Sequence, residues 1–353
     1  MRGLIINPGS TSTKLGIFTD ETLEMDVTLR HSTEEISRFE SIAAQQDFRR
    51  NMILDFLKEK GIDVGSFDVI VGRGGILKPV PGGTYAVSDE LMHDLEIGVQ
   101  GQHAANLGGI LAREIGDEIG VPSYIVDPIS VDELCDEARL SGLPEIPRMS
   151  VFHALNHKAV CRRYAGEAGK KYEELNLICI HLGGGVSVAA HSKGRVIDVF
   201  NALDGDGAFS PERTGALPVG GLIRLCYSGK YTEKEMMKRV VGEGGFNAYM
   251  GTNDAGAILK MADEGDEKAG LMMNAFVFQI CKNTGAMAAV LKGAVDRIII
   301  TGGIAYNTPV TDAITDRVSF IAPVTVYPGE DELHALAQGV LRVMRGEEEA
   351  KVY

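Results

Sequence analysis

A turn that carries glycine, hydroxyl groups and one ammonium group lies near the start of the 353-residue sequence. An apolar run at 4–6 leads into Asn7-Pro8-Gly9, four hydroxyl residues follow at 10–13, and Lys14 closes the turn. Backbone N–H groups, hydroxyls and a positive charge together suit a phosphate chain. A P-loop is excluded, because its second glycine is missing and apolar residues resume at 15–18 where a P-loop would begin a helix. The stretch predicts a phosphate-binding hairpin, with a polar turn without a ligand as the alternative.

Two later apolar runs also end in glycines. Residues 177–180 precede His181-Leu182-Gly183-Gly184-Gly185, and residues 298–300 precede Thr301-Gly302-Gly303. Glycine at the end of a strand lets backbone and ligand approach closely. One such turn is weak evidence, but three of them favour a shared ligand.

Charged residues follow two other predicted strands. Arg73 lies between glycines after the apolar run 69–71, and Asp127 closes the run 124–126. A guanidinium fork suits a carboxylate, and open α/β sheets bind ligands at the carboxyl ends of their strands. We expect Arg73 to bind an anion, with an ordinary surface turn as the alternative.

A long polar loop at 201–218 contains Arg213. It is not a calcium loop, because Phe209 and Gly215 occupy the positions where an EF-hand requires glycine and glutamate. Loops of this length without secondary structure are usually functional, which favours a role for Arg213 over simple solvation.

Polar side chains also occur near predicted helix starts. His153 and His157 lie four residues apart on a helix expected from about residue 150. Ala154 rules out an H-E-x-x-H motif and no third ligand is evident, so a packed or catalytic histidine is favoured over zinc. Asp254 ends a polar turn and could be either a ligand contact or a helix N-cap.

The composition excludes several classes of function. Acidic residues outnumber basic ones by 49 to 35, which argues against a broad surface for nucleic acid or anionic membranes. No apolar segment approaches the roughly 20 residues of a membrane span, and the start lacks a signal cleavage site, so a cytoplasmic protein is expected. The five cysteines are widely spaced and form no C-x-x-C, which predicts free thiols.

These turns require strands and helices to position them. Strands alternate with helical patterns at 48–57, 107–115, 271–291 and 333–344, which is typical of α/β folds, and the length suits two lobes. Residues 32–35 resemble a capping box, and the charged last residues are expected to fray.

Taken together, the motifs resemble the acetate and butyrate kinase family, within the superfamily of actin-like proteins, sugar kinases and heat-shock ATPases. Residues 7–14 are similar to the family's first phosphate motif, 181–185 to its second and 301–304 to its adenosine motif. The chain is shorter than a typical acetate kinase, has Gly184 where those enzymes usually carry Asn, and reads Gly72-Arg73-Gly74-Gly75 where they have a longer motif. These departures favour the butyrate kinase branch.

The resemblance implies an α/β fold of two actin-like (ribonuclease H-like) lobes with a nucleotide cleft between them. The N-terminal lobe would span 1–128, completed by the C-terminal helix at 331–353, and residues 129–330 would form the lobe that binds the nucleotide. It further implies reversible transfer of phosphate from ATP, with Mg²⁺, to a short-chain fatty acid such as butyrate or isobutyrate. A homo-oligomer, dimeric or larger, is expected by family likeness alone.

The resemblance also implies a role for each candidate residue. The phosphate chain and the metal shell would be contacted by Asn7, Ser10, Ser12 and Lys14. Arg73 would hold the acceptor carboxylate, and Asp127 would organise Mg²⁺. His153 and Arg213 would stabilise the phosphoryl group during transfer.

The other nucleotide contacts would be made by His181, Gly183, Gly184, Gly185, Asp254, Gly302 and Gly303. The family's carboxylate near the C-terminal turn would be Glu330, Asp331 or Glu332, and ungapped alignment selects Asp331 as a metal ligand. Acetate kinases have Glu at that position.

Three other functions stay open at this point. A kinase for acetate or propionate would use the same motifs, because the sequence does not size the acyl pocket. A sugar kinase would need an aspartate as general base for a hydroxyl, whereas a carboxylate is already ionised at neutral pH. An actin-like or chaperone-like ATPase shares the phosphate hairpins but leaves Arg73 without a purpose, and the chain ends soon after Met344 with no peptide-binding domain appended.

Overall fold

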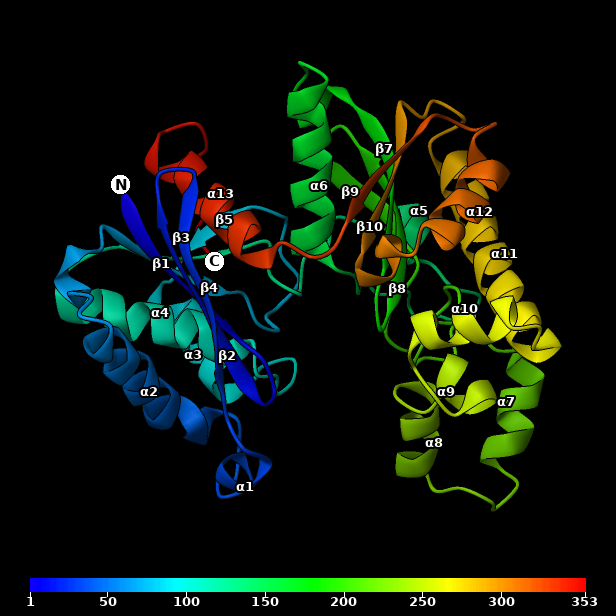
Figure 1. Cartoon of the computed structure of the whole chain (residues 1–353), viewed down its shortest axis with the longest axis horizontal. Coiled ribbons are helices and arrows are strands. Elements are labelled where there is room, and N and C mark those ends of the chain that lie inside the picture. Colours follow the sequence, from blue (N-terminus) through cyan, green and yellow to red (C-terminus); the bar gives the residue numbers. More distant parts are fainter. The chain divides into compact units, whose positions relative to one another are not determined.

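The computed structural model describes residues 1–353, apart from the side chain of Thr33, and divides into two compact units (Figure 1). Unit 1 comprises Met1–Val131 and Asp331–Tyr353, and unit 2 comprises Asp132–Glu330. Each unit is a sheet flanked by helices with its own apolar core. Among the described residues, none of the helices combines the length and the apolar character that a membrane span requires.

The sheet of unit 1 has the strand order β3-β2-β1-β4-β6-β5. Its strands are β1 (Arg2–Pro8), β2 (Ser12–Thr19), β3 (Thr22–Arg30), β4 (Val69–Arg73), β5 (Thr84–Ala86) and β6 (Ser123–Val126). The first three form an antiparallel meander, and β1, β4 and β6 run parallel. Residues 4–6 and 69–71 are fully buried, as expected for central strands covered on both faces.

Helices cover both faces of this sheet. They are α1 (Thr33–Ile36), α2 (Gln46–Glu59), α3 (Asp89–Ile97), α4 (Asn106–Ile119) and α13 (Glu332–Met344). Helix α4 approaches Ile125 through Gly109, whereas α13 approaches Val126 through Gly339. Because successive strand residues point to opposite faces, α4 and α13 lie on opposite sides of the sheet. The predicted capping box is present, since Ser32 and Glu35 bond to each other's backbone N–H groups.

The prediction that the last residues fray is wrong. The backbone N–H of Lys351 donates to the carbonyl of Thr84 at 2.8 Å, and its carbonyl accepts from the N–H of Ala86. The hydroxyl of Tyr353 donates to Asp94 at 2.7 Å. The charged tail is therefore held at the free edge of β5, where unpaired backbone groups were available.

The sheet of unit 2 repeats the topology of unit 1. Its strands are β7 (Asn176–Leu182), β8 (Val186–Ser192), β9 (Arg195–Val199), β10 (Arg297–Gly302) and β11 (Val324–Pro328), in the order β11-β10-β7-β8-β9. As in unit 1, an antiparallel meander of three strands is extended by two parallel strands beside its first strand. Two units with one topology indicate a duplicated α/β fold.

Some helices of unit 2 pack on its sheet, and others lie away from it (Figure 1). The helices are α5 (Asp136–Arg139), α6 (Ala154–Glu167), α7 (Val219–Cys226), α8 (Glu233–Val240), α9 (Gly245–Met250), α10 (Ala255–Asp263), α11 (Glu267–Val290) and α12 (Thr308–Val318). Ile178 and Ile180 of β7 join the core that contains α11, whereas Leu177 and Cys179 join a separate cluster with α6. Helices α6 and α11 therefore cover opposite faces.

Two helices begin at residues other than those predicted. Helix α6 begins at Ala154 instead of about residue 150, because the carbonyl of Val151 accepts a hydrogen bond from the N–H of Ala202 and is not available to a helix. Helix α11 begins at Glu267, four residues before the predicted start, because the carboxylate of Asp266 caps its first turn.

Candidate active site

The hairpin tip between β1 and β2 is held from inside unit 1 by Arg49. This guanidinium is 1% exposed and donates to the carbonyl oxygens of Gly9 and Ser12 at 2.9 Å and to that of Ser10 at 3.1 Å. Burial lowers the pKa of Arg49 to about 10. Arg49 also donates to the hydroxyl of Thr13 at 3.1 Å, so it fixes carbonyl groups and one hydroxyl group of the hairpin. Arg49 is not among the predicted site residues, because its only signal in the sequence is a basic residue among the apolar positions of α2.

Two predicted side chains of unit 1 bind one carboxylate, and a third lies beside one of them on the hairpin. Asn7 donates to Glu332 Oε2 at 2.7 Å, and Arg73, the last residue of β4, forms an ion pair with the same carboxylate. Lys14 pairs with Asn7 across β1 and β2, so both side chains are on one face of the hairpin. The ammonium of Lys14 lies 3.0 Å from Asp26 and is 39% exposed.

The two aspartates predicted to bind metal differ in their surroundings. Asp127 directly follows β6, is 3% exposed and accepts a hydrogen bond from the N–H of Gly83 at 2.7 Å. Its backbone φ of 38° is positive, which residues other than glycine seldom adopt. Asp331 caps α13 by accepting from the N–H of His334 at 3.2 Å. Asp331 therefore has a structural task, whereas Asp127 is held in a strained position at a strand end.

In unit 2, the tip between β7 and β8 is supported by histidines. His181 is buried, shares a 2.7 Å hydrogen bond with Asn156 through Nδ1, and stacks on His153 with ring centroids 3.7 Å apart. Its Nε2 lies 2.9 Å from Glu330 Oε1 but is not aligned for a hydrogen bond. His153 is the N-cap residue of α6 and shares a 2.9 Å hydrogen bond with Ser187. The structure thus places His153 directly against the predicted phosphate turn.

Ser187 also connects His153 to His157, whose Nε2 lies 2.8 Å from the same hydroxyl oxygen. His157 is fully buried, and burial together with the neighbouring His191 and His181 holds its pKa well below the usual value. His157 is therefore a neutral, packed histidine, whereas His153 lies at the site.

Arg213 lies against the same hairpin tip. Its guanidinium donates to the carbonyl of Ala202, and a side chain at position 185 would collide with it, so Gly185 makes room for Arg213. Burial lowers the pKa of Arg213, opposed in part by Glu212 and Asp204. The arginine predicted from the loop and the glycine predicted from the hairpin are therefore neighbours.

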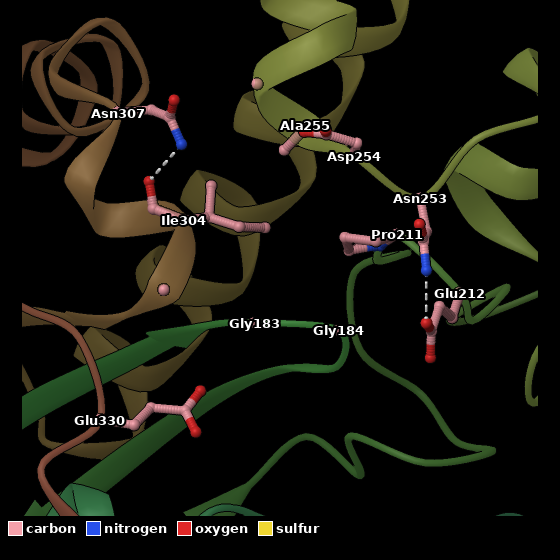
Figure 2. Close-up of a pocket in the computed structure, with 12 residues that line it drawn as sticks. Gly183, Gly184, Pro211, Glu212, Asn253, Asp254, Ala255, Ile304, Asn307 and Glu330 are labelled. Atoms are coloured by element: carbon pink, nitrogen blue, oxygen red, sulfur yellow. Dashed lines mark hydrogen bonds between the residues drawn. The ribbon is translucent and has the colours of Figure 1, made fainter. Parts of the chain in front are cut away.

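A cavity of about 410 Å³ opens beside this tip within unit 2 (Figure 2). It is lined by Gly183 and Gly184 of the hairpin, by the start of α10 at Asp254, and by Gly303 after β10. Figure 2 shows Glu330 on the side of the hairpin, away from Asp254. All three glycine-rich or polar turns singled out in the second half of the sequence therefore meet at one cavity.

Two details define the walls of this cavity. Asp254 caps α10 by accepting from the N–H of Ala257 at 3.0 Å, so its N-cap role is confirmed and it also lines the cavity. Gly302 has a φ of 92°, and a side chain there would collide with the backbone of Leu182, so glycine allows β10 to end against β7. Three carboxylates, from Glu212, Asp254 and Glu330, line the cavity, so a bound phosphate chain would need a cation with it.

The chain is similar to known proteins over its whole length. Residues 146–322 match the family model described as the acetokinase family. Butyrate kinase 1 of Clostridium acetobutylicum is 60% identical over 352 residues, covering 100% of this chain and 99% of that protein. A probable butyrate kinase of Clostridium botulinum is 58% identical over 350 residues, covering 99% of both.

Among solved structures, acetate kinase of Porphyromonas gingivalis superposes with a TM-score of 0.80 at 19% identity, covering 97% of this chain and 99% of that one. Acetate kinase of Entamoeba histolytica gives a TM-score of 0.76 at 17% identity, covering 96% and 98%. The predicted fold class of two actin-like α/β units is confirmed by these likenesses. The full-length matches show that the chain belongs to the acetokinase family, as a relative of its butyrate kinases.

Proposed function

We propose that this chain transfers the terminal phosphoryl group of ATP to the carboxylate of a short-chain fatty acid, with butyrate or isobutyrate preferred. Relatives named butyrate kinases that match the whole chain at 57–60% identity support this reaction. The observation that carries it is the cavity in unit 2, where three turns meet beside Arg213 and His153. One carboxylate oxygen attacks the γ-phosphorus and the bond to ADP breaks, so the products are acyl phosphate and ADP and no proton must move.

Unit 2, corresponding to the predicted lobe 129–330, is proposed to bind the nucleotide. Backbone groups of Gly183, Gly184 and Gly185 would follow the phosphate chain, as close approach to backbone requires. The nucleoside would lie between Asp254 at the start of α10 and the backbone at Gly302 and Gly303. A cavity of about 410 Å³ has the size expected for a small-molecule site.

Unit 1, corresponding to the predicted lobe 1–128 with 331–353, is proposed to supply the acceptor and metal groups. Arg73 would exchange its ion pair with Glu332 for one with the acid, because a guanidinium fork binds either carboxylate in the same way. Asn7, Ser10, Ser12 and Lys14 would contact phosphate oxygens.

The carboxylates of unit 1 fit Mg²⁺, which prefers oxygen ligands. Asp127 would hold the ion. Of the three carboxylates near the C-terminal turn, we favour Glu332 over Asp331, since Asp331 caps α13 while Glu332 already contacts two candidate site residues. When bound, Mg²⁺ would neutralise charge on the phosphate oxygens.

His153 and Arg213 are proposed to stabilise the phosphoryl group in transfer. Its transition state spreads negative charge over equatorial oxygens, so catalysis depends on positive groups and hydrogen-bond donors fixed in advance. Ser187 holds the Nδ1 edge of His153, and Gly185 lets Arg213 lie at the tip. Both groups are therefore pre-positioned.

The test is acyl hydroxamate formation by the full chain with ATP, Mg²⁺, hydroxylamine and a series of acids: acetate, propionate, butyrate, isobutyrate and longer branched acids. We expect the highest kcat/KM with a four-carbon acid. A preference for acetate or propionate would reassign the substrate. ADP release stimulated only by polyols, or hydrolysis of ATP indifferent to acids, would refute the carboxylate kinase. A homo-oligomer is part of the same proposal, and light scattering of the purified chain tests it.

A further inference from the structure

A compact group of nitrogen and sulfur side chains lies beneath the candidate site, on the α6 face of the second sheet. Its members are His157 and Cys161 of α6, Cys179 of β7 and His191 of β8, each with 0% exposure. His157 and Cys161 are four residues apart, so they share one face of α6. The reaction proposed above assigns no task to any of these four side chains.

The strand register explains how the other two members meet. Leu177 pairs with His191 and Cys179 with Ala189, so Cys179 and His191 are diagonal neighbours on one face of the sheet. That face packs against α6, since Cys179 and Cys161 belong to one buried cluster. One ligand atom from each of His157, Cys179 and His191 lies within 4.8 Å of the others.

One nitrogen of each imidazole lies at the separation found between two ligands of a metal site. His157 Nδ1 and His191 Nε2 face each other at 3.3 Å. With zinc–nitrogen bonds of 2.0 to 2.1 Å, two nitrogens of a tetrahedral site are about 3.4 Å apart. The outer nitrogens are held by hydroxyl groups, from Ser187 at 2.8 Å and Tyr172 at 2.6 Å. Such outer hydrogen bonds fix the ring orientation of ligating histidines.

We propose that His157, Cys179 and His191 bind a divalent transition-metal ion, best matched by Zn²⁺, and that Cys161, which lies outside this group of three, moves in as the fourth ligand when the metal binds. Cys161 is buried in the same cluster as Cys179 and follows His157 by one turn of α6, so only a short movement is required. Two imidazoles and two thiolates form a ligand set that suits zinc and disfavours Mg²⁺ or Ca²⁺. Bound metal would take the place of the hydrogen bond between the two rings. The proton of that hydrogen bond would move to the outer nitrogen of its own ring, and the two thiol protons would leave to solvent.

The site would be structural, because all four ligands are buried and no coordination position faces solvent. It would join α6 to β7 and β8. Since Ser187 bonds both His157 and His153, the metal would also fix the position of His153 at the candidate active site. The alternative is a metal-free row of hydrogen bonds from Tyr172 through His191 and His157 to Ser187.

The decisive measurement is the metal content of the full-length chain, purified without a histidine tag, under reducing conditions and without chelators. We expect about one zinc ion per chain. Replacing zinc by Co²⁺ should produce the visible bands of a tetrahedral site and the near-ultraviolet absorption of thiolate ligands. Both readouts are independent of kinase activity, so they hold or fail separately from the proposed reaction.

Variants then identify the ligands. Cys179→Ser and His191→Gln should lose the zinc and the cobalt spectrum, whereas Cys281→Ser, which changes a half-buried cysteine of α11 outside the cluster, should keep both. If a ligand variant fails to fold, the wild-type measurements still decide. A wild-type chain that binds neither Zn²⁺ nor Co²⁺ would overturn the proposal in favour of the hydrogen-bonded row, as would full metal content in a Cys179→Ser/His191→Gln variant.

Discussion

The hairpin tips of β1–β2 and β7–β8 occupy the same place in two sheets of one topology, yet they are supported in different ways. In unit 1 a single buried guanidinium, Arg49, binds the carbonyl groups of the tip. In unit 2 the support comes from stacked and hydrogen-bonded histidines, with Arg213 lying against Gly185. The difference teaches that topology repeats the turn while the side chains behind it decide its chemistry. The first tip is shaped for rigidity, and the second carries groups suited to developing charge.

The variant Arg49→Met tests whether the first tip depends on this guanidinium, and it should have the largest effect. Methionine keeps the bulk of the side chain and removes every hydrogen-bond donor. The substitution would remove one donor from each of the carbonyl oxygens of Gly9, Ser10 and Ser12, of which Ser12 keeps the N–H of Gly9, at a cost of roughly 3 kcal/mol in unfolding free energy. Denaturant unfolding measures the loss. Arg50→Met, which breaks only an ion pair with Glu118 at the surface, should cost at most about 1 kcal/mol. Equal losses in both variants would contradict the role of Arg49.

Arg213→Ala tests the second tip. If Arg213 meets charge that develops during transfer, kcat should fall by roughly a hundredfold or more, with little change in KM for the acid. Lysine at this position should restore only part of the rate, because an ammonium lacks the planar fork.

Steady-state kinetics measures the effect. The control is Arg224→Ala, which removes an exposed arginine of α7 and so shows the effect of a general loss of positive charge. An Arg213→Ala variant with unchanged kcat and weakened acid binding would reverse the roles of the two arginines.

Arg73→Ala tests the opposite role in unit 1. A group that holds the acid equally in the ground state and the transition state appears in KM. We expect KM for the acid to rise by roughly tenfold while kcat changes less, as for the loss of a charged hydrogen bond. Initial rates at a series of butyrate concentrations give both KM and kcat. The control is Arg30→Ala, at the exposed end of β3. A pure loss of kcat would show that Arg73 acts on the phosphoryl group instead.

The smallest expected effect is a loss of folding stability at low pH. His31 lies behind the first tip, where its Nε2 is 2.9 Å from Thr13, and burial, aided by Arg49 and opposed by Glu35, lowers its pKa to about 4 from 6.5. Below pH 6.5 the unfolded chain therefore binds a proton at His31, whereas the folded chain does not bind it until the pH approaches 4. Stability from this group is complete above pH 6.5 and is lost as the pH falls toward 4.

The expected loss is roughly 1–3 kcal/mol, because each pKa unit corresponds to about 1.4 kcal/mol. Thermal unfolding of wild type and His31→Asn between pH 4 and 7 measures it, and the variant should show the flatter profile. Equal slopes would mean that His31 keeps an ordinary pKa.

Much of the local structure was predictable because it depends on neighbours in sequence. The apolar runs at 4–6 and 298–300 are buried strands, Ser32 and Glu35 form the expected capping box, and Asp254 caps α10. The helix start at Ala154 was missed, because it is decided by Ala202, a partner 51 positions away from Val151 in the sequence. The fraying of the tail was wrongly predicted for the same reason, since Lys351 bonds to the distant residue Thr84.

The candidate site likewise has features that the sequence predicted and features that depend on the tertiary structure. Residue types and spacing indicated the glycine turns and the arginines at 73 and 213 as candidates, because phosphate and carboxylate recognition requires such groups at strand ends and in loops. The resemblance of these motifs to known ones indicated the family. Only the tertiary structure decided that Arg49 supports the first tip, that Glu332 contacts both Asn7 and Arg73, and that Cys179 and His191 join His157. The physical reason is that hydrogen bonds, ion pairs and metal coordination act over a few ångströms in space and leave no fixed spacing along the chain when their partners come from different strands and helices.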